Sequence, residues 1–395
     1  MSNFVLASIL METKMRQIDI KEVGNKHEMD EFVEFGNRLY ADCPYYVPDL
    51  KIDIHNFFSP KSNPGLEFSD VQPFIACDEN GKVVGRVAAI INHKANKTWN
   101  VKNVRFGFLD FVDDIDVAAA LLRKVETWGR ERGMTNVQGP MGITDFDKEG
   151  MLVEDFDKKA TIITLYNYPY YPKYLEQLGY KKEVDWISIC IDIPDKLPEK
   201  FVRVEKLVTE RFGLRMKRVT KCEIMKGGYG HKIFNLLNSV YSPLFGFSEL
   251  STAQIDYFLR SYIPFIDTRC ISLVENKNEE LVAAAITMPS LSEAMRKTKG
   301  KLLPLGWYHL LKAIKMSRSD KLDMMLIAIR SDYQGMGVNA LLFKDIYNVC
   351  HLCGYTHAET GPQLENNSKE LSQWKLFDPE LLLSAKSSLS MIKIG

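Results

Sequence analysis

Residues 327–343 read IAIRSDYQGMGVNALLF, and this stretch decides how the second half of the chain is interpreted. A run of apolar residues ends at Ile329, a short polar loop carries Gly335 and Gly337, and a helical pattern begins at Val338. The pattern therefore predicts a strand, a loop and a helix in immediate succession. Glycine lets a backbone approach a ligand closely, and the first amides of a helix have no partner inside it. Together with the helix dipole, such amides can bind a phosphate group.

The same loop could be a plain strand–turn–helix connection that contains two glycines. It is not the phosphate loop of nucleotide hydrolases, because no Lys followed by Ser or Thr stands after Gly337. It is not a dinucleotide-binding fingerprint either, since a third glycine is missing and the strand lies late in the chain. These residues alone leave a coenzyme site and an ordinary connection open.

The composition is that of a globular protein, and 395 residues suit two domains better than one. The 51 basic residues equal the 51 acidic ones, which argues against a dedicated nucleic-acid binder. No apolar run approaches the roughly 20 residues of a membrane-spanning helix. The seven scattered cysteines favour a reduced, cytoplasmic compartment.

The pattern along the chain predicts two similar halves, 1–194 and 195–395, because a charged segment with two prolines at 191–200 follows an apolar strand. In the first half, two strands flank Asn80-Gly81, a strong hairpin signal. Further strands and helices follow, and the second half repeats their order. This repetition indicates an internal duplication, or it is a coincidence, because such an α/β order is common. The predicted elements are strands at 71–77, 83–91, 135–140, 270–275, 281–287, 322–329 and 355–360, and helices at 116–132, 338–352 and 365–377.

The glycine-containing loop resembles that of the GNAT superfamily of acyl-CoA-dependent N-acyltransferases, whose motif is Gln/Arg-x-x-Gly-x-Gly/Ala. Gln334, Gly337 and Asn339 occupy the three marked positions, and Asn339 departs from the usual small residue. The resemblance covers roughly residues 15–377. It implies an α/β (α+β) fold of two tandem GNAT-like domains, each a mixed twisted sheet flanked by helices.

In such proteins the strand before the loop splays away from the next strand, and the pantetheine arm of the coenzyme lies in the gap. The resemblance therefore implies that the strands at 322–329 and 355–360 separate, and that acyl-CoA or acetyl-CoA is the co-substrate, without a metal. The residues that it places against the coenzyme are Ile327, Ala328, Ile329, Gln334, Gly335, Met336, Gly337, Val338, Asn339 and Asn367.

A second motif of this superfamily is an Asn followed seven residues later by a Tyr, and the two halves match it to different extents. In the second half Asn367 fits, but Trp374 stands in the Tyr position, and a tryptophan cannot protonate a leaving thiolate. In the first half Asn167 and Tyr174 match. The segment FVDDID at 111–116, however, has no glycine, and its three aspartates would repel a pyrophosphate although they suit a helix start. The resemblance thus implies a degenerate first domain and an acyl-CoA-binding second domain.

Acyl transfer to an amine needs a group that takes the proton of the amine. Glu359 is the first candidate for this base, because it ends a predicted strand at the coenzyme gap, and Asp323 on the neighbouring strand is the second. Either could instead be an ordinary carboxylate. Tyr174 could act as an acid if the first half closed over the same cleft; the alternative is a tyrosine of the core or rim.

The segments at 85–90, 106–111, 138–157 and 167–171 resemble a group of bacterial tandem GNAT proteins, some of which acylate sphingoid bases as ceramide synthases. The implied reaction moves an acyl group from acyl-CoA to an amine, with a long-chain or lipid-like amine as the narrower expectation. Two alternatives remain: a non-catalytic ligand-binding or scaffold protein, and a Fem-type aminoacyl transferase, also built from paired GNAT-like units.

Two further segments allow a functional and a structural interpretation. Residues 144–157 carry six acidic residues without EF-hand spacing, and they form either a loop that shapes the acceptor site or a solvated turn. Residues 296–318 carry seven Lys or Arg and no acid around Leu305, Tyr308 and Leu311. This combination is typical of a helix on an anionic membrane, here the inner membrane face, or belongs to an insertion that packs on the second domain.

Overall fold

The computed structural model describes residues 18–316, 319–367, 374 and 382–394. Its strands are β1 (Asp19–Glu22), β2 (Ser69–Cys77), β3 (Val83–Asn92), β4 (Asn103–Phe111), β5 (Asn136–Gly139), β6 (Met151–Leu152), β7 (Lys181–Asp192), β8 (Arg215–Lys217), β9 (Ile271–Glu275), β10 (Leu281–Pro289), β11 (Lys321–Ile329), β12 (His357–Thr360), β13 (Gln363–Leu364) and β14 (Leu382–Ile394). Its α-helices are α2 (Lys26–Leu39), α3 (Lys51–Phe57), α4 (His93–Trp99), α5 (Ile115–Arg130), α6 (Tyr170–Gln177), α7 (Glu199–Phe212), α8 (Lys221–Met225), α9 (Tyr229–Tyr241), α10 (Thr252–Tyr262), α11 (Ser292–Thr298), α12 (Gly306–Met316) and α13 (Asn339–Cys353).

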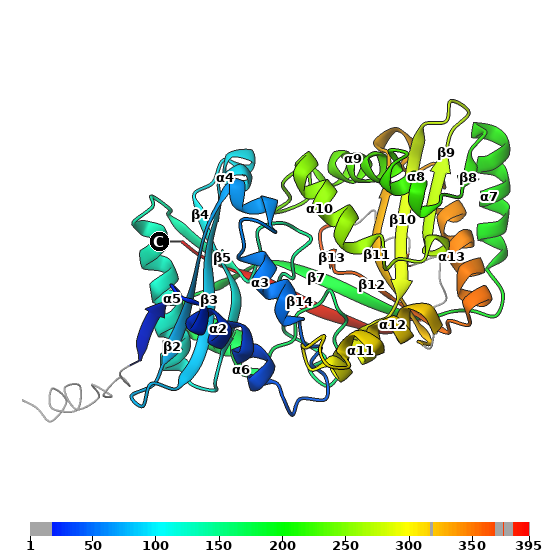
Figure 1. Ribbon diagram of the computed structural model, residues 1–395. Coiled ribbons are helices and arrows are strands. Elements are labelled where there is room, and N and C mark those ends of the chain that lie inside the picture. Colours follow the sequence, from blue (N-terminus) through cyan, green and yellow to red (C-terminus); the bar gives the residue numbers. More distant parts are fainter. Residues whose placement is uncertain (1–17, 317–318, 368–373, 375–381, 395) are drawn as a thin grey trace, which may run out of the picture.

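The first half forms the elements predicted for it. β2 and β3 pair as an antiparallel hairpin, and Gly81 in their turn has a φ of +77°, which glycine adopts without strain. The helix predicted at 116–132 is α5, which packs with α6 on one face of the sheet against Phe74 and Phe106. Helices α2 and α3 pack on the opposite face against Ile75. The half is therefore a sheet between two helical layers (Figure 1).

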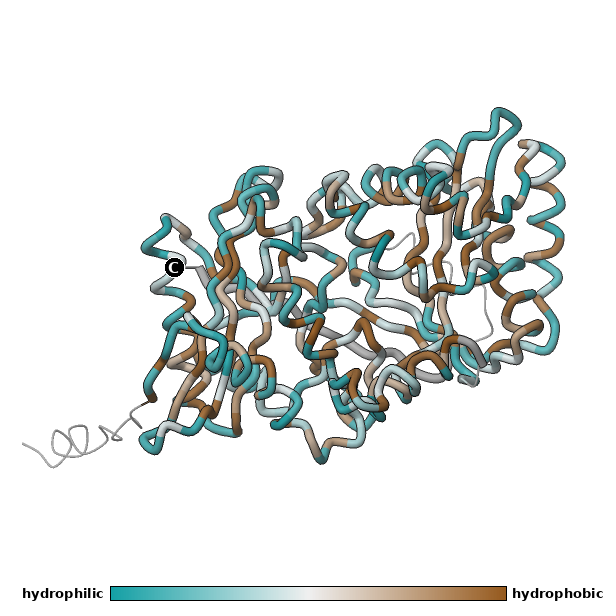
Figure 2. The backbone as a smooth tube through the Cα atoms, viewed as in Figure 1, coloured by the Kyte–Doolittle hydropathy of each residue, from teal (hydrophilic) through white to brown (hydrophobic). Residues whose placement is uncertain are grey.

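The second half repeats this arrangement. β9 and β10 form the predicted hairpin, and the predicted strand, helix and strand that follow are β11, α13 and β12. α13 ends at Cys353 and is capped by Gly354, whose φ is +76°. Helices α7 and α13 cover one face of the sheet, and α8, α9 and α10 cover the other. Figure 2 shows hydrophobic residues concentrated in the strands of both halves.

The two halves share strands in the middle of the molecule. The sheet order is β1-β2-β3-β4-β5-β14-β7-β12-β11-β10-β9-β8, with β6 and β13 beside this path. β7 precedes the predicted boundary at residue 195 but pairs with β12 of the second half. The C-terminal strand β14 lies between β5 and β7. One sheet therefore continues from one half into the other, and the division into 1–194 and 195–395 stays a prediction.

Two sequence expectations need comment. The basic segment 296–318 is not one helix, because α11 and α12 are separated by a turn that contains Lys299, with a φ of +50°, and Pro304. Most of the helix predicted at 365–377 lies outside the described residues. No helix in the described ranges is both long and apolar enough to cross a membrane.

Candidate functional site

β11 and β12 pair only over part of their length. Their parallel ladder joins Lys321–Met324 to His357–Thr360, and one further hydrogen bond runs from the Gly361 amide to the Met324 carbonyl at 2.8 Å. β12 then ends, whereas β11 continues to Ile329 with β10 as its partner. The two strands therefore separate as the GNAT resemblance implies.

A β-bulge in β11 lies at the point where the gap opens. Leu326 pairs with Ile286 of β10 and Met324 with Thr287, so Met325 is the extra residue. A bulge interrupts the alternation of side chains along a strand. Accordingly, Met324 packs on the α13 side of the sheet, while Leu326 packs on the α9 side. The bulge turns the remainder of β11 relative to the paired segment.

The free edge of β11 is held by two side chains. The backbone amide of Arg330 donates to the carbonyl of Val282 on β10. Because hydrogen-bonded and non-hydrogen-bonded pairs alternate along an antiparallel ladder, the N–H and C=O of Ile327 point away from β10. The Tyr241 hydroxyl of α9 donates to the Ile327 carbonyl at 2.8 Å and accepts from its amide at 3.4 Å. The Gln334 amide nitrogen donates to the Ile329 carbonyl at 3.0 Å. Tyr241 and Gln334 thus bond the backbone where a pantetheine arm would pair.

The loop before α13 leaves backbone amides available. Gly335 and Gly337 have φ values of +76° and +84°, which L-residues with a side chain rarely adopt. Hydrogen bonds within the described residues engage none of the amides of Gly335, Gly337, Val338 and Asn339. Such amides at a helix N-terminus can bind an anion.

Gly337 has a second reason to be glycine. A Cβ atom at this position would lie 2.6 Å from Cγ1 of Val204 on α7. Gly335 meets nothing within 4 Å, and the side chain of the intervening Met336 is exposed. The loop is therefore packed against α7 on one side and open to solvent on the other.

The two candidate bases lie side by side beneath the gap. Asp323 and Glu359 are register partners in the β11–β12 ladder, and both are buried, with exposed fractions of 1% and 5%. Their neighbours Leu322 and Ala358 belong to the core on the α13 side. Because side chains alternate along a strand, the two carboxyl groups face the other side of the sheet, below α9.

Tyr174 does not join these carboxylates. It lies on α6 against the core of the first half, and its hydroxyl donates to Asp113 at 2.7 Å. Of the second motif, Asn367 lies in a turn after β13, with its amide bonded to the Leu364 carbonyl at 3.0 Å. Trp374 is buried, and its indole N–H donates to Gln363 at 2.8 Å. These contacts favour a structural role for Trp374, whose indole cannot act as the acid that a tyrosine at this position could provide.

The first half has a corresponding gap that its own side chains fill. β4 pairs with β5 only from Asn103 to Arg105. Beyond this, the Tyr171 hydroxyl accepts from the Phe111 amide at 3.0 Å, and the Tyr170 hydroxyl donates to the Phe111 carbonyl at 2.7 Å. At the start of α5, the Asp114 carboxylate accepts from the Asp116 amide. Tyrosine hydroxyls therefore bond the strand backbone at Phe111, and a carboxylate bonds one amide in the first turn of α5.

The acidic segment contacts the second half. Phe146 packs on Phe234 and Phe258, with ring centroids 6.0 Å and 5.1 Å away, which contradicts a solvated turn at this position. Burial raises the pKa of Asp145 to about 7, although the charge of Arg105 acts to lower it. Residues 144–149 therefore form part of the contact between the halves.

Sequence reasoning missed Tyr241, because a tyrosine at the end of an amphipathic helix has the pattern of a core or rim residue. It also missed Ile163 of the first half, whose Cδ1 lies 3.3 Å from where a Cβ on Gly361 would be. Both contacts join segments far apart in the chain, and no local motif indicates them.

No protein-family model matches the chain. The chain is 27% identical over 359 residues to the bacterial ceramide synthase of Caulobacter vibrioides, covering 89% of this chain and 91% of that protein. It is 27% identical over 325 residues to Protein YghO of Escherichia coli, covering 78% of each. A solved tandem GNAT protein from the clavulanic acid biosynthesis pathway superposes with a TM-score of 0.53 at 11% identity, covering 96% of this chain and 98% of that one. The chain therefore has the fold of the tandem GNAT proteins.

Proposed function

We propose that the protein transfers an acyl group from acyl-CoA to an amine, and that the second half binds the donor. The observation that carries this proposal is the set of available amides of Gly335, Gly337, Val338 and Asn339, next to the edge of β11 that β12 does not pair with. The amides suit the diphosphate of coenzyme A, and the strand edge suits the amide groups of its pantetheine arm. Gln334 and the edge residues Ile327 and Ile329 then border one continuous donor site.

In the proposed reaction the amine nitrogen attacks the thioester carbon, and the bond from carbon to sulfur breaks. The amine must lose a proton, for which Glu359 is the first candidate base and Asp323 the second. The thiolate of coenzyme A leaves and takes its proton from solvent. Burial of the two carboxyl groups beneath the gap supports this assignment, because a carboxylate in a dry site binds a cationic amine strongly.

A long-chain or lipid-like amine is the proposed acceptor. Similarity over most of the chain to a bacterial ceramide synthase supports it. The exposure of Leu305, Tyr308 and Leu311 supports peripheral contact with the inner membrane face, because apolar side chains that face solvent can enter the interface of a bilayer. A cytoplasmic enzyme with this surface could take its acceptor from a bilayer.

The direct test is release of free thiol from acetyl-CoA and from a long-chain acyl-CoA, each with a short water-soluble amine and with a long-chain amino alcohol. We expect thiol release that needs both the donor and the long-chain amine. Calorimetry that detected binding of neither donor would favour a scaffold protein. A salt-sensitive complex with aminoacyl-tRNA and no thiol release would favour a Fem-type aminoacyl transferase.

A further inference from the structure

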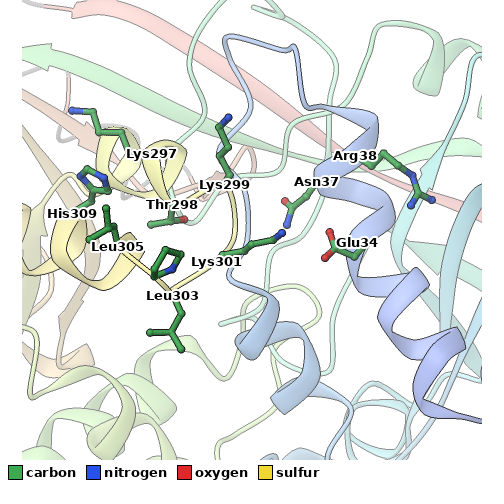
Figure 3. A pocket seen from close by; sticks show the side chains of 12 residues that line it. Glu34, Asn37, Arg38, Lys297, Thr298, Lys299, Lys301, Leu303, Leu305 and His309 are labelled. Atoms are coloured by element: carbon green, nitrogen blue, oxygen red, sulfur yellow. The ribbon is translucent and has the colours of Figure 1, made fainter.

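An open pocket lies between the two halves, away from the coenzyme loop. It has a volume of about 350 Å³ and lies between α2 and the connection from α11 to α12 (Figure 3). Its lining includes Glu34 of α2, the basic residues Lys297, Lys299 and Lys301, and the apolar residues Leu303 and Leu305. The pocket combines basic side chains with apolar ones.

Three lysines give the pocket a positive charge. Lys297, Lys299 and Lys301 form no ion pair with any residue in the described ranges. The carboxylate in the lining, Glu34, is paired with Lys51, and Arg38 bonds Glu31 at 3.3 Å. The protein as a whole has no net charge, so this local excess of cations is not a general property of its surface. Such a pocket favours an anion.

The turn that carries two of these lysines is held in place by the first half. The carbonyl of Gly300 accepts from the Lys51 amide at 2.9 Å. A Cβ on Gly300 would lie 2.3 Å from the Asn37 side chain and 2.8 Å from the Asp49 carbonyl. Glycine therefore lets the turn pack directly on the first half, and this contact fixes the backbone from which Lys299 and Lys301 extend.

The rim of the pocket continues into an exposed apolar surface. Leu303 and Leu305 are 76% and 62% exposed, and Trp307 and Tyr308 are 46% and 48% exposed. Four large apolar side chains this close together in sequence rarely face water in a soluble monomer. Aromatic residues beside lysines are typical of a surface that enters the interface of a bilayer.

We propose that this pocket binds the phosphate group of an anionic phospholipid, while Leu303, Leu305 and Trp307 enter the bilayer around it. A phosphate complements the positive charge of the pocket, and attached acyl chains complement the apolar rim; a lipid provides both in one molecule. A free phosphate would leave the apolar rim in water.

This docking would bring the bilayer to the end of the sheet that carries the candidate bases. α12 leads into β11, which begins at Lys321, and Asp323 follows two residues later, about 7 Å further along the strand. An amine in the same bilayer would then lie near the entrance to Asp323 and Glu359. This last step rests on the proposed acyl transfer, whereas binding of the phospholipid does not.

The test is flotation of the protein with vesicles of phosphatidylcholine alone and of phosphatidylcholine mixed with phosphatidylglycerol. We expect binding to the mixed vesicles only, and a loss of about tenfold or more in the variant Lys299→Glu/Lys301→Glu. The variant Leu303→Asn/Leu305→Asn should weaken binding while the lysines remain. The control Lys206→Glu/Lys226→Glu reverses two exposed charges elsewhere and should bind as the unmodified protein does. Thermal unfolding of each variant establishes that it is folded.

Equal binding to the two vesicle types, or full binding by Lys299→Glu/Lys301→Glu, would overturn the proposal. Calorimetric binding of inorganic phosphate without binding to vesicles would assign the pocket to a free anion and would overturn it as well. Thiol release by the unmodified protein with a soluble amine is measured in parallel. If thiol release fails while vesicle binding holds, the lipid site stands and the proposed acyl transfer falls.

Discussion

Asp323 and Glu359 are register partners in the short parallel ladder between β11 and β12, directly below the place where these strands separate. Parallel strands lie about 4.8 Å apart, so the two buried carboxyl groups extend from neighbouring points on the same face of the sheet. Their burial and proximity are the reason why the proposed function names them as candidate bases.

We expect Glu359→Gln to lower kcat for amide formation by about 10²–10⁴-fold, because general base catalysis contributes about that factor. Asp323→Asn should have a smaller effect on kcat if Glu359 is the base. The KM for acyl-CoA should change little in either variant. Steady-state thiol release measures both constants. Asp320→Asn, which changes an exposed carboxylate just before β11, is the control, and a similar loss in that variant would remove the assignment.

The loop before α13 allows a substitution whose effects on binding and stability have opposite signs. Asn339→Asp is nearly isosteric and places a negative charge in the first turn of the helix, where the dipole stabilises it by about 0.3–1 kcal/mol. The same charge would repel a diphosphate. We expect the Kd for coenzyme A to rise about tenfold or more, while the free energy of unfolding is unchanged or slightly higher.

Calorimetry and urea unfolding measure these two quantities. Asn348→Asp on the same helix is the matched control, since Asn348 is exposed and lies near the other end of α13. Unchanged affinity in Asn339→Asp would show that the diphosphate binds elsewhere.

The Tyr241 hydroxyl bonds the backbone of Ile327, the group that the proposed donor site offers to the pantetheine arm. Removing its hydroxyl by Tyr241→Phe should cost about 0.5–1.5 kcal/mol in the absence of ligand, because the partly buried carbonyl loses its donor. The Kd for acyl-CoA should fall by a similar free energy, about 2–10-fold, since the pantetheine no longer has to displace the hydroxyl. Calorimetry with the same acyl-CoA on both proteins measures this. Weaker binding by the variant would mean that the hydroxyl assists the donor instead.

The filled gap of the first half predicts that each chain binds one acyl-CoA. The Tyr171 hydroxyl accepts from the Phe111 amide, the Tyr170 hydroxyl donates to the Phe111 carbonyl, and the Asp114 carboxylate accepts from the Asp116 amide at the start of α5. A second donor would have to displace all three contacts and approach the aspartates. The stoichiometry from calorimetry should therefore be one donor per chain, and a value of two would show that both halves are active binders.

Whether a feature could be predicted from the sequence depends on how far apart in the chain the residues that form it lie. The loop from Gln334 to Asn339 and the helix stop at Gly354 are local, and glycine spacing was enough to predict them. The proximity of Asp323 to Glu359 was predicted only through the resemblance, because it requires the pairing of two separate strands. The insertion of β14 between β5 and β7 arises from non-local pairing without a local signal. The break between α11 and α12 was missed although Pro304 favours it, since the apolar spacing of the segment suggested one helix.

Buried acids between the halves predict a pH dependence of stability. Burial raises the pKa of Asp145 to about 7, against the effect of Arg105, and burial also raises the pKa of Glu149. Between about pH 4 and pH 7 the folded protein retains a proton on Asp145 that the unfolded chain has lost. The contribution of Asp145 to the free energy of unfolding therefore falls as pH rises through this window, by at most about 1.4 kcal/mol per pH unit. Above pH 7 this contribution changes no further.

Asp145→Asn removes the titrating group and keeps the shape of the side chain. Urea unfolding of both proteins from pH 5 to pH 8 should show the variant gaining stability relative to the unmodified protein up to about pH 7, where the difference levels off. Asp157→Asn, at an exposed position of the same acidic segment, should follow the unmodified protein at every pH. Parallel curves for Asp145→Asn and the unmodified protein would mean that water reaches Asp145, and that the contact between the halves around Phe146 is looser than its packing on Phe258 indicates.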